Sequence, residues 1–434
     1  MNFCQIFKPI SISLSPNTEK DDIRLALKLL LRPWKWKNGN AVGKIESQFK
    51  EYIGIKNAIS FNSGRSCLMA ILNSLNLEKG GEILVQAFTC NAASNPIKWS
   101  GLIPVFVDCD ESTFNMDPED LKMKITPQSR AVMVQHTFGL PADLDKISSI
   151  CREKNLVLIE DCAHALGAEY ISKKVGLPTE ARRAKVGTFG KVSFFSFSRD
   201  KIISSVYGGM VCTDDPSLAE KLWQMRDSLD YPSYYWILQQ LLHPILMNYI
   251  ILPTYRLFGK YLLVIFQSVN IMSKAVHWKE KRGEKPDYFP KKFPNALAIL
   301  AINQMDKIDR FNNHRREIVN FYYHNLKNSE FELPENPENS KQVFLRFSIK
   351  HPKAHQIIKK AWKRNLLIGD WYTSPVAPRD TELEKVGYIL GSCPVAEKLA
   401  KTTLNLPTHI NTSESDAKTI VNFVKRHGDQ RSKQ

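Results

Sequence analysis

One lysine in a polar turn, directly after an aromatic strand-like run, has the most distinctive chemistry in the sequence. The segment Ser193–Gly209 reads SFFSFSRDKIISSVYGG, and Lys201 lies in its turn, five residues after Ser196. A lysine at the end of a sheet that is shielded from water beside an aromatic aldehyde becomes less basic and can form a Schiff base. A surface lysine in a loop is the ordinary alternative, and the segment alone does not separate the two.

A carboxylate at the end of another apolar run is the second candidate. Asp161 closes the run Leu156–Asp161 (LVLIED), and His164 follows three residues later. A buried carboxylate needs a partner because desolvation of its charge is costly. The protonated ring nitrogen of a cofactor would be such a partner. An aspartate that caps the following turn is an equally good interpretation of Asp161 taken alone.

A glycine-containing turn in front of a helix is the third candidate. In Phe61–Met69 (FNSGRSCLM), a strand-like run enters Ser63-Gly64 and opens an amphipathic segment. Exposed amides at a helix start bind phosphate groups, here with the hydroxyls of Ser63 and Ser66 beside them. Arg65 would add a positive charge. By itself, such a turn indicates only a helix cap.

One overlapping motif points to a different class of enzyme. Ser198-Arg199-Asp200-Lys201 matches the S-x-x-K pattern of serine β-lactamases and penicillin-binding proteins. The sequence contains no KTG or SDN partner motif. The surroundings also alternate strands and helices, so we disfavour this interpretation.

Alternating strands and helices must position these residues. The pattern predicts an α/β fold, with a large domain whose mainly parallel sheet is covered by helices on both faces. Ligands of such sheets bind beyond the carboxyl ends of the strands, where Asp161, His136 and Lys201 fall. The predicted strands are Glu82–Val85, Ile103–Asp108, Ala131–His136, Leu156–Asp161, Val192–Phe197 and Gly209–Thr213.

Composition is that of a globular enzyme. Of the 434 residues, 43% are hydrophobic and 24% are charged, which are ordinary values for a globular protein. A chain of this length is too long to fold around one small hydrophobic core. Lys and Arg total 60 against 44 acidic residues, and such a basic surface attracts polyanions. No nucleic-acid-binding module is recognisable, so nucleic acid is not an expected partner. The eight cysteines show no zinc or disulfide spacing, and no metal site is expected. We see no secretion signal, which favours a cytoplasmic location.

Three sections follow along the chain. Residues 1–230 form the predicted large domain with an N-terminal arm, and residues 231–290 an apolar and basic insertion. Residues 291–434 hold a connecting helix at Ala296–Leu326, which could break near Phe311, and a small C-terminal α/β domain.

The insertion contains two apolar segments, Trp236–Ile251 and Leu257–Met272. Each is shorter than the roughly twenty residues that a membrane-spanning helix needs. Three interpretations stay open. The segments could be core or dimer-interface helices, they could lie on the inner face of a membrane, or they could form a shallow membrane hairpin.

Taken together, the motifs resemble the DegT/DnrJ/EryC1/StrS family of pyridoxal-phosphate (PLP)-dependent sugar aminotransferases, which have fold type I. The resemblance implies a sheet of the seven-stranded type and a smaller C-terminal domain. It covers nearly the whole chain outside 231–290. The segments that carry it are Trp36–Glu46, Ser63-Gly64, Gly101–Asp108, His136–Asp143, Glu160–Gly167, Ser196–Lys201 with Gly208-Gly209, and Pro394–Pro407.

The resemblance also implies roles for single residues. Lys201 would carry PLP and move a proton on the substrate, and Asp161 would keep the pyridine nitrogen protonated. Further residues would complete the site: His164 beside the ring hydroxyl, Cys90 over the ring, Gly64, Arg65, Ser66 and Ser196 at the phosphate, and His136 and Tyr207 toward the substrate. The implied reaction moves an amino group from L-glutamate to a nucleotide-linked keto sugar in glycan or polysaccharide biosynthesis, in a homodimer.

Two departures from the family leave alternatives open. Tyr207 replaces an acidic residue that relatives commonly have after the lysine. An Asn that reaches the neighbouring subunit's phosphate is missing, and Lys291 or Lys292 could substitute for it electrostatically. A sugar dehydratase would carry His in place of Lys201. A PLP-binding sensor without turnover is the alternative from another functional class.

Overall fold

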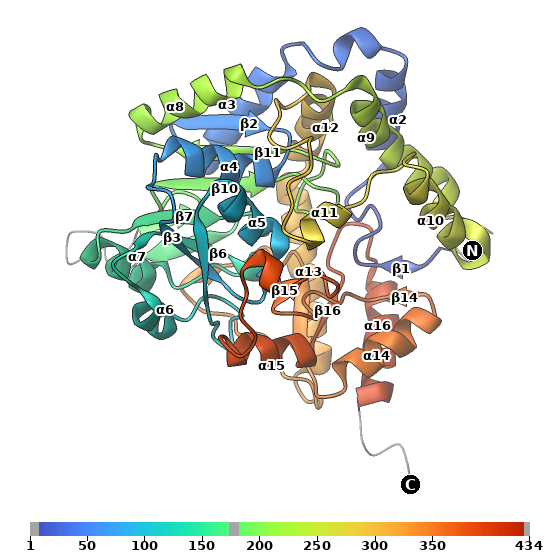
Figure 1. Ribbon diagram of the computed structural model, residues 1–434. Helices are drawn as coiled ribbons and strands as arrows, with labels where there is room; N and C mark the ends of the chain where they lie inside the picture. The colour runs from blue at the N-terminus through green and yellow to red at the C-terminus, as the bar shows by residue number, and fades with distance from the viewer. Residues whose placement is uncertain (1–7, 173–181, 429–434) are drawn as a thin grey trace.

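A mainly parallel sheet with helices on both faces forms the centre of the protein (Figure 1). The computed structural model describes residues 8–172 and 182–428. Within them the central sheet has seven strands in the order β2-β11-β10-β7-β6-β3-β5, and only β11 runs antiparallel to its neighbours. The strands are β2 (Asn57–Phe61), β3 (Glu82–Gln86), β5 (Ile103–Val107), β6 (Ser129–Gln135), β7 (Val157–Asp161), β10 (Val192–Ser196) and β11 (Gly209–Thr213). The predicted α/β class is therefore confirmed, with strand ends shifted by one or two residues.

Alternation along each strand explains why both faces are covered. Successive side chains of a strand point to opposite faces. Accordingly Phe194 packs in one hydrophobic cluster and Phe195 in the other. Helices α4 (Gly64–Ser74), α5 (Asn91–Trp99) and α8 (Pro216–Ser228) cover the first face. Helices α3 (Ala41–Ile53), α7 (Leu144–Glu153) and α12 (Asn295–Met305) cover the second.

The C-terminal part has a hydrophobic cluster of its own. It joins helix α13 (Ile308–Leu326) to an antiparallel strand pair, and the helices α14, α15 and α16 of this part lie in the lower half of Figure 1. The predicted connecting helix is two helices, and its break lies at Asp306 and Lys307, earlier than the predicted position near Phe311. The elements are α13 (Ile308–Leu326), β13 (Phe347–Lys350), α14 (Ala354–Lys363), α15 (Pro394–Thr402), β16 (Thr403–Leu406) and α16 (Glu414–Gly428).

The insertion forms a helical hairpin at one side of the molecule (Figure 1). Its first arm, α9 (Tyr234–Leu246), packs against α2 (Lys20–Leu30) and buries Trp236 and Ile237 in the main core. Its second arm, α10 (Lys260–Ser268), buries no residue. Two π-helical turns join the arms, η3 (Met247–Ile251) and η4 (Tyr255–Gly259).

The hairpin also bears on the question of a membrane span. Among the helices of the described residues, none is by itself long and apolar enough to cross a bilayer. The segments Tyr234–Ile251 and Tyr255–Ser268 meet that criterion only together, and the chain bends by 107° between them.

Candidate active site

A cavity of about 110 Å³ lies at the carboxyl ends of strands β7 and β10, in front of the first turn of α4. These two strands are neighbours, and Phe194 of β10 pairs with Asp161 of β7. Of the predicted site residues, the structure brings together on its wall Gly64, Arg65, Cys90, Asp161, His164, Ser196, Lys201 and Tyr207. Ser66 lies directly behind this wall, and His136 lies apart from it.

Lys201 is held in a tight turn after β10. Its backbone N–H donates to the carbonyl of Ser198 at 3.0 Å, and the Asn17 side-chain amide donates to the carbonyls of Lys201 and Ile202. The Nζ atom lies 4.9 Å from the ring centroid of Trp371. Burial lowers the pKa of the Lys201 ammonium, although nearby acidic groups oppose the shift. A less basic amine is the reactive form that attacks an aldehyde.

Asp161 is the last residue of β7 and is almost completely buried. One carboxylate oxygen accepts the backbone N–H of Ala163 at 3.0 Å. Burial raises the pKa of the Asp161 carboxyl, because that single bond and the charge of Lys201 compensate its desolvation only in part. A cationic N–H group placed in the cavity would supply the missing partner.

His164 forms a flat wall next to Asp161. Its ring stacks against Phe138 at a centroid distance of 6.0 Å and against Trp371 at 5.6 Å. Burial and the positive charges of Lys201 and Arg346 lower the pKa of His164 well below its usual value. The imidazole is therefore neutral, and it can offer a hydrogen bond and a stacking surface.

The start of α4 forms a small polar cradle. The hydroxyl of Ser63 caps the helix and accepts the N–H of Ser66 at 3.0 Å, which leaves the N–H groups of Gly64 and Arg65 without an intrahelical acceptor. A Cβ atom at Gly64 would lie 3.1 Å from Cβ of Ser196, so only glycine fits here without displacing that side chain. The donors and the missing side chain suit a phosphate group.

The side chain of Arg65 does not serve this cradle. Its Nε lies 2.5 Å from Oε2 of Glu280, which is fully buried, and its Nη2 donates to the carbonyl of Ala275 at 3.1 Å. Glu280 raises the pKa of the Arg65 guanidinium against the effect of burial. The positive charge predicted at the phosphate is thus neutralised by a residue far along the chain.

Residues 273–280, which we call the strap, lie along the cavity and include Glu280 of this pair. Arg199 donates to the carbonyl and hydroxyl of Ser273 at 2.8 and 2.9 Å, and the hydroxyl of Tyr207 donates to the carbonyl of Lys274 at 2.9 Å. Ala275 and Val276 line the cavity. The phenol of Tyr207, which the sequence placed near the substrate, therefore ties down the strap.

The opposite wall comes from the C-terminal part of the chain. Trp371 and Tyr372 stack on one another and line the cavity together with Cys90. The guanidinium of Arg346 lies 3.3 Å from the ring centroid of Trp371 and pairs with Asp200 at 3.3 Å. The sequence analysis did not predict this aromatic wall, although two adjacent aromatic residues directly after Asp370 could have indicated a binding surface.

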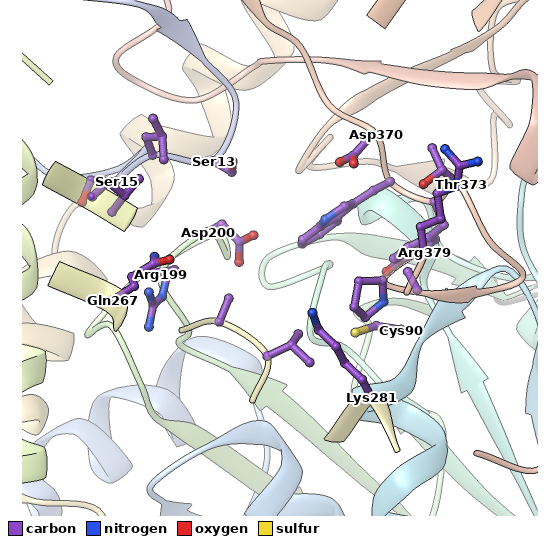
Figure 2. Close-up of a pocket in the computed structure, with 18 of the residues that line it drawn as sticks. Ser13, Ser15, Cys90, Arg199, Asp200, Gln267, Lys281, Asp370, Thr373 and Arg379 are labelled. Carbon is purple, nitrogen blue, oxygen red and sulfur yellow. The ribbon is translucent and has the colours of Figure 1, made fainter. Parts of the chain in front are cut away.

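A second cavity, of about 370 Å³, adjoins the first and shares seven of its lining residues, among them Cys90 and Trp371. Figure 2 shows Cys90 and Lys281 on one side of it and Arg199 and Gln267 on the other. Met247 and Leu263 of the hairpin also line it. Three cationic side chains therefore border a cavity that lies next to the first: Arg199, Lys281 and Arg379.

Two predicted groups have partners elsewhere. His136 is fully buried, its Nδ1 accepts the N–H of Ala142 at 3.1 Å, and its Nε2 donates to Glu160 at 3.2 Å. Both ring nitrogens are thus used inside the core, the arrangement of a structural histidine. The amines of Lys291 and Lys292 lie beside Asp230 and Tyr231, respectively.

Comparisons with known proteins agree with this geometry. A sequence model of the DegT/DnrJ/EryC1/StrS aminotransferase family matches residues 17–229 and 272–425 and leaves out residues 230–271, which contain the hairpin. GDP-perosamine synthase of Escherichia coli O157:H7 is 28% identical over 311 residues, which are 72% of this chain and 69% of that protein. The dTDP-3-amino-3,6-dideoxy-alpha-D-galactopyranose transaminase of Aneurinibacillus thermoaerophilus is 26% identical over 94% of this chain and 95% of its own.

Solved structures confirm the fold. The aminotransferase from Psychrobacter cryohalolentis superposes with a TM-score of 0.73 at 20% identity, over 96% of this chain and 98% of that one. The fold predicted from the sequence is therefore correct. Because the family match spans most of the sequence and includes both Asp161 and Lys201, this chain belongs to the DegT/DnrJ/EryC1/StrS aminotransferase family.

Proposed function

We propose that this protein is a PLP-dependent aminotransferase that moves an amino group from L-glutamate to a nucleotide-linked keto sugar in glycan biosynthesis. The observation that carries the proposal is one cavity that encloses the amine of Lys201 and the carboxylate of Asp161, next to a phosphate-binding helix start. Relatives named for GDP-, UDP- and dTDP-linked sugars support the substrate class.

The residues of the first cavity fit PLP by their chemistry. When bound, PLP supplies the electron-withdrawing ring that makes amino transfer possible. Asp161 would keep a proton on the ring nitrogen, and the N–H groups of Gly64 and Arg65 would bind the phosphate with the hydroxyl of Ser196. The amine of Lys201 would hold the cofactor and would move a proton on the substrate carbon. His164 and Cys90 would lie beside the ring.

The second cavity fits the sugar substrate. Arg199, Lys281 and Arg379 are cations on its wall, and cations of this kind bind phosphate groups such as those of a nucleotide. Arg199 also donates to Ser273, and Lys281 pairs with Asp380. The aromatic pair Trp371 and Tyr372 lies between the two cavities, where it excludes water from the reacting atoms.

We also propose the division into 1–230, 231–290 and 291–434, the homodimer and the cytoplasmic location that the sequence indicates. The separate hydrophobic cluster of the C-terminal part supports the division. In such a dimer, Lys291 or Lys292 of one subunit would have to lie beside the cofactor cavity of the other subunit to bind its phosphate.

Reconstitution with PLP tests the proposal. Borohydride reduction followed by peptide mapping should place the cofactor on Lys201, and L-glutamate should convert bound PLP to its amine form. Lys201→Ala should lose both signals. Lys191→Ala, which alters an exposed lysine that precedes β10, should keep them.

Addition of keto-sugar nucleotides to the reconstituted protein then separates the alternatives. Bound PLP that glutamate does not convert would indicate a sensor. Loss of water from a keto sugar without amine transfer would indicate a dehydratase. Turnover of keto-sugar nucleotides by the Lys201→Ala variant would refute the proposal.

A further inference from the structure

The hairpin exposes an apolar face that is unusual for a protein surface. Along η4 and α10, the side chains of Leu257, Phe258, Tyr261, Val264 and Ile265 are each 50% or more exposed. They are spaced three or four residues apart along the helical turns, so they lie on one side of the hairpin. Contiguous apolar surface of this kind marks a site of protein or membrane interaction.

This exposure is part of an ordered structure. The inner side of the hairpin has a small core of its own, formed by Met247, Ile251, Leu252 and Met272. Leu263 and Phe266 of α10 pack against that core, while Val264 and Ile265 point outward. One side of α10 is therefore packed against the protein, and its other side is exposed to solvent.

The charge around this face identifies what it contacts. No Asp or Glu occurs from residue 231 to residue 279, although the chain has 44 acidic residues. The charged side chains of the hairpin itself are Arg256 and Lys260, and both are cationic. Exposed Tyr249 accompanies them. Apolar side chains among cations, with aromatic residues beside them, suit the headgroup region of an anionic bilayer.

A second copy of the chain fits this face less well. A two-fold contact would bring the same surface of both copies together. Arg256 and Lys260 of each copy would then approach cations without an acidic partner on the hairpin, and like charges across an interface are unfavourable.

We propose that the hairpin, residues 234–271, docks this enzyme on the surface of an anionic lipid bilayer. The 107° bend allows the apolar side of η4 and α10 to enter the headgroup region while α9 stays packed on α2. Met247 and Leu263 of the hairpin also line the larger cavity, so docking holds that cavity beside the lipid surface.

Sedimentation of the full-length protein with lipid vesicles tests whether the hairpin binds an anionic bilayer. The protein should bind vesicles that contain phosphatidylglycerol, bind much less to phosphatidylcholine alone, and release as salt rises. The double variant Val264→Glu/Ile265→Glu should lower the affinity by about tenfold or more, and Arg256→Glu/Lys260→Glu should lose the preference for the anionic lipid.

A matched control alters exposed apolar residues elsewhere. Ile389 and Leu390 are 74% and 72% exposed, and Ile389→Glu/Leu390→Glu should bind vesicles as the unaltered protein does. Circular dichroism confirms that each variant is folded. Two results would overturn the proposal: no binding of the unaltered protein to anionic vesicles, or equal binding by the Val264→Glu/Ile265→Glu variant. In the first case, conversion of a dimer to a monomer by that variant would assign the face to a subunit interface.

Discussion

The ion pair between Arg65 and Glu280 should hold the strap against the smaller cavity. The side chain of Arg65 is 10% exposed and that of Glu280 is 0% exposed. Glu280→Gln leaves a guanidinium that cannot lose its proton in a buried position. Removal of one partner of a buried pair destabilises a structure by about 3–5 kcal/mol. Since 1.4 kcal/mol is a factor of ten, local opening of the strap should become roughly 100-fold or more frequent.

Hydrogen exchange measured by mass spectrometry reads this opening directly. The amides of Glu280, Arg282 and Gly283 are hydrogen-bonded within or beside the short helix α11 (Trp278–Lys281), and their exchange should accelerate. The double variant Arg65→Met/Glu280→Leu removes both charges and should exchange more slowly than Glu280→Gln.

An exposed ion pair directly after this short helix gives the control. Arg282 and Glu382 lie 3.2 Å apart with 53% and 43% of their side chains exposed, so Arg282→Ala should change the opening by less than about 1 kcal/mol. Equal acceleration in Glu280→Gln and Arg282→Ala would show that burial of the pair does not control the strap, and the reasoning would be wrong.

Three further predictions concern the cavity and the core beside it. Burial raises the pKa of the Asp161 carboxyl above its unfolded value, so the stability that this group contributes is present at acid pH and is lost as pH rises through the folded pKa. Asp161→Asn should therefore stabilise the cofactor-free protein to urea at neutral pH but not at acid pH, and should slow the glutamate reaction by about 100-fold or more; an unchanged rate would contradict the assigned role. Gly64→Val should weaken PLP binding by roughly tenfold or more in a fluorescence titration, because its side chain would displace Ser196; normal affinity would argue against the cradle. His136→Ala should lower the free energy of unfolding by about 1–3 kcal/mol, because it leaves Glu160 with fewer partners, while the KM for the sugar stays constant; a changed KM at unchanged stability would restore the predicted substrate role.

Local sequence was sufficient for the strands and for the positions of Asp161 and Lys201, whereas the roles of these two residues came from the family resemblance. Short runs of Val, Ile and Phe that end in polar residues define parallel strands, and the carboxyl ends of such strands meet at one edge of a sheet. Asp161 and Lys201 could therefore be placed together before any coordinates. The Ser63 cap likewise depends on neighbouring residues only.

Tertiary structure alone decided which distant groups complete the site. The strap and the wall of Trp371 and Tyr372 are far from Lys201 in sequence, and no local periodicity reports a contact across such a distance. The same holds for Arg65, whose charge goes to Glu280 rather than to the phosphate cradle. The two arms of the hairpin are both apolar, yet α9 is buried against α2 and α10 is exposed. The composition of a helix shows that it prefers apolar surroundings. Only the packing of the whole chain determines whether other parts of the protein provide those surroundings.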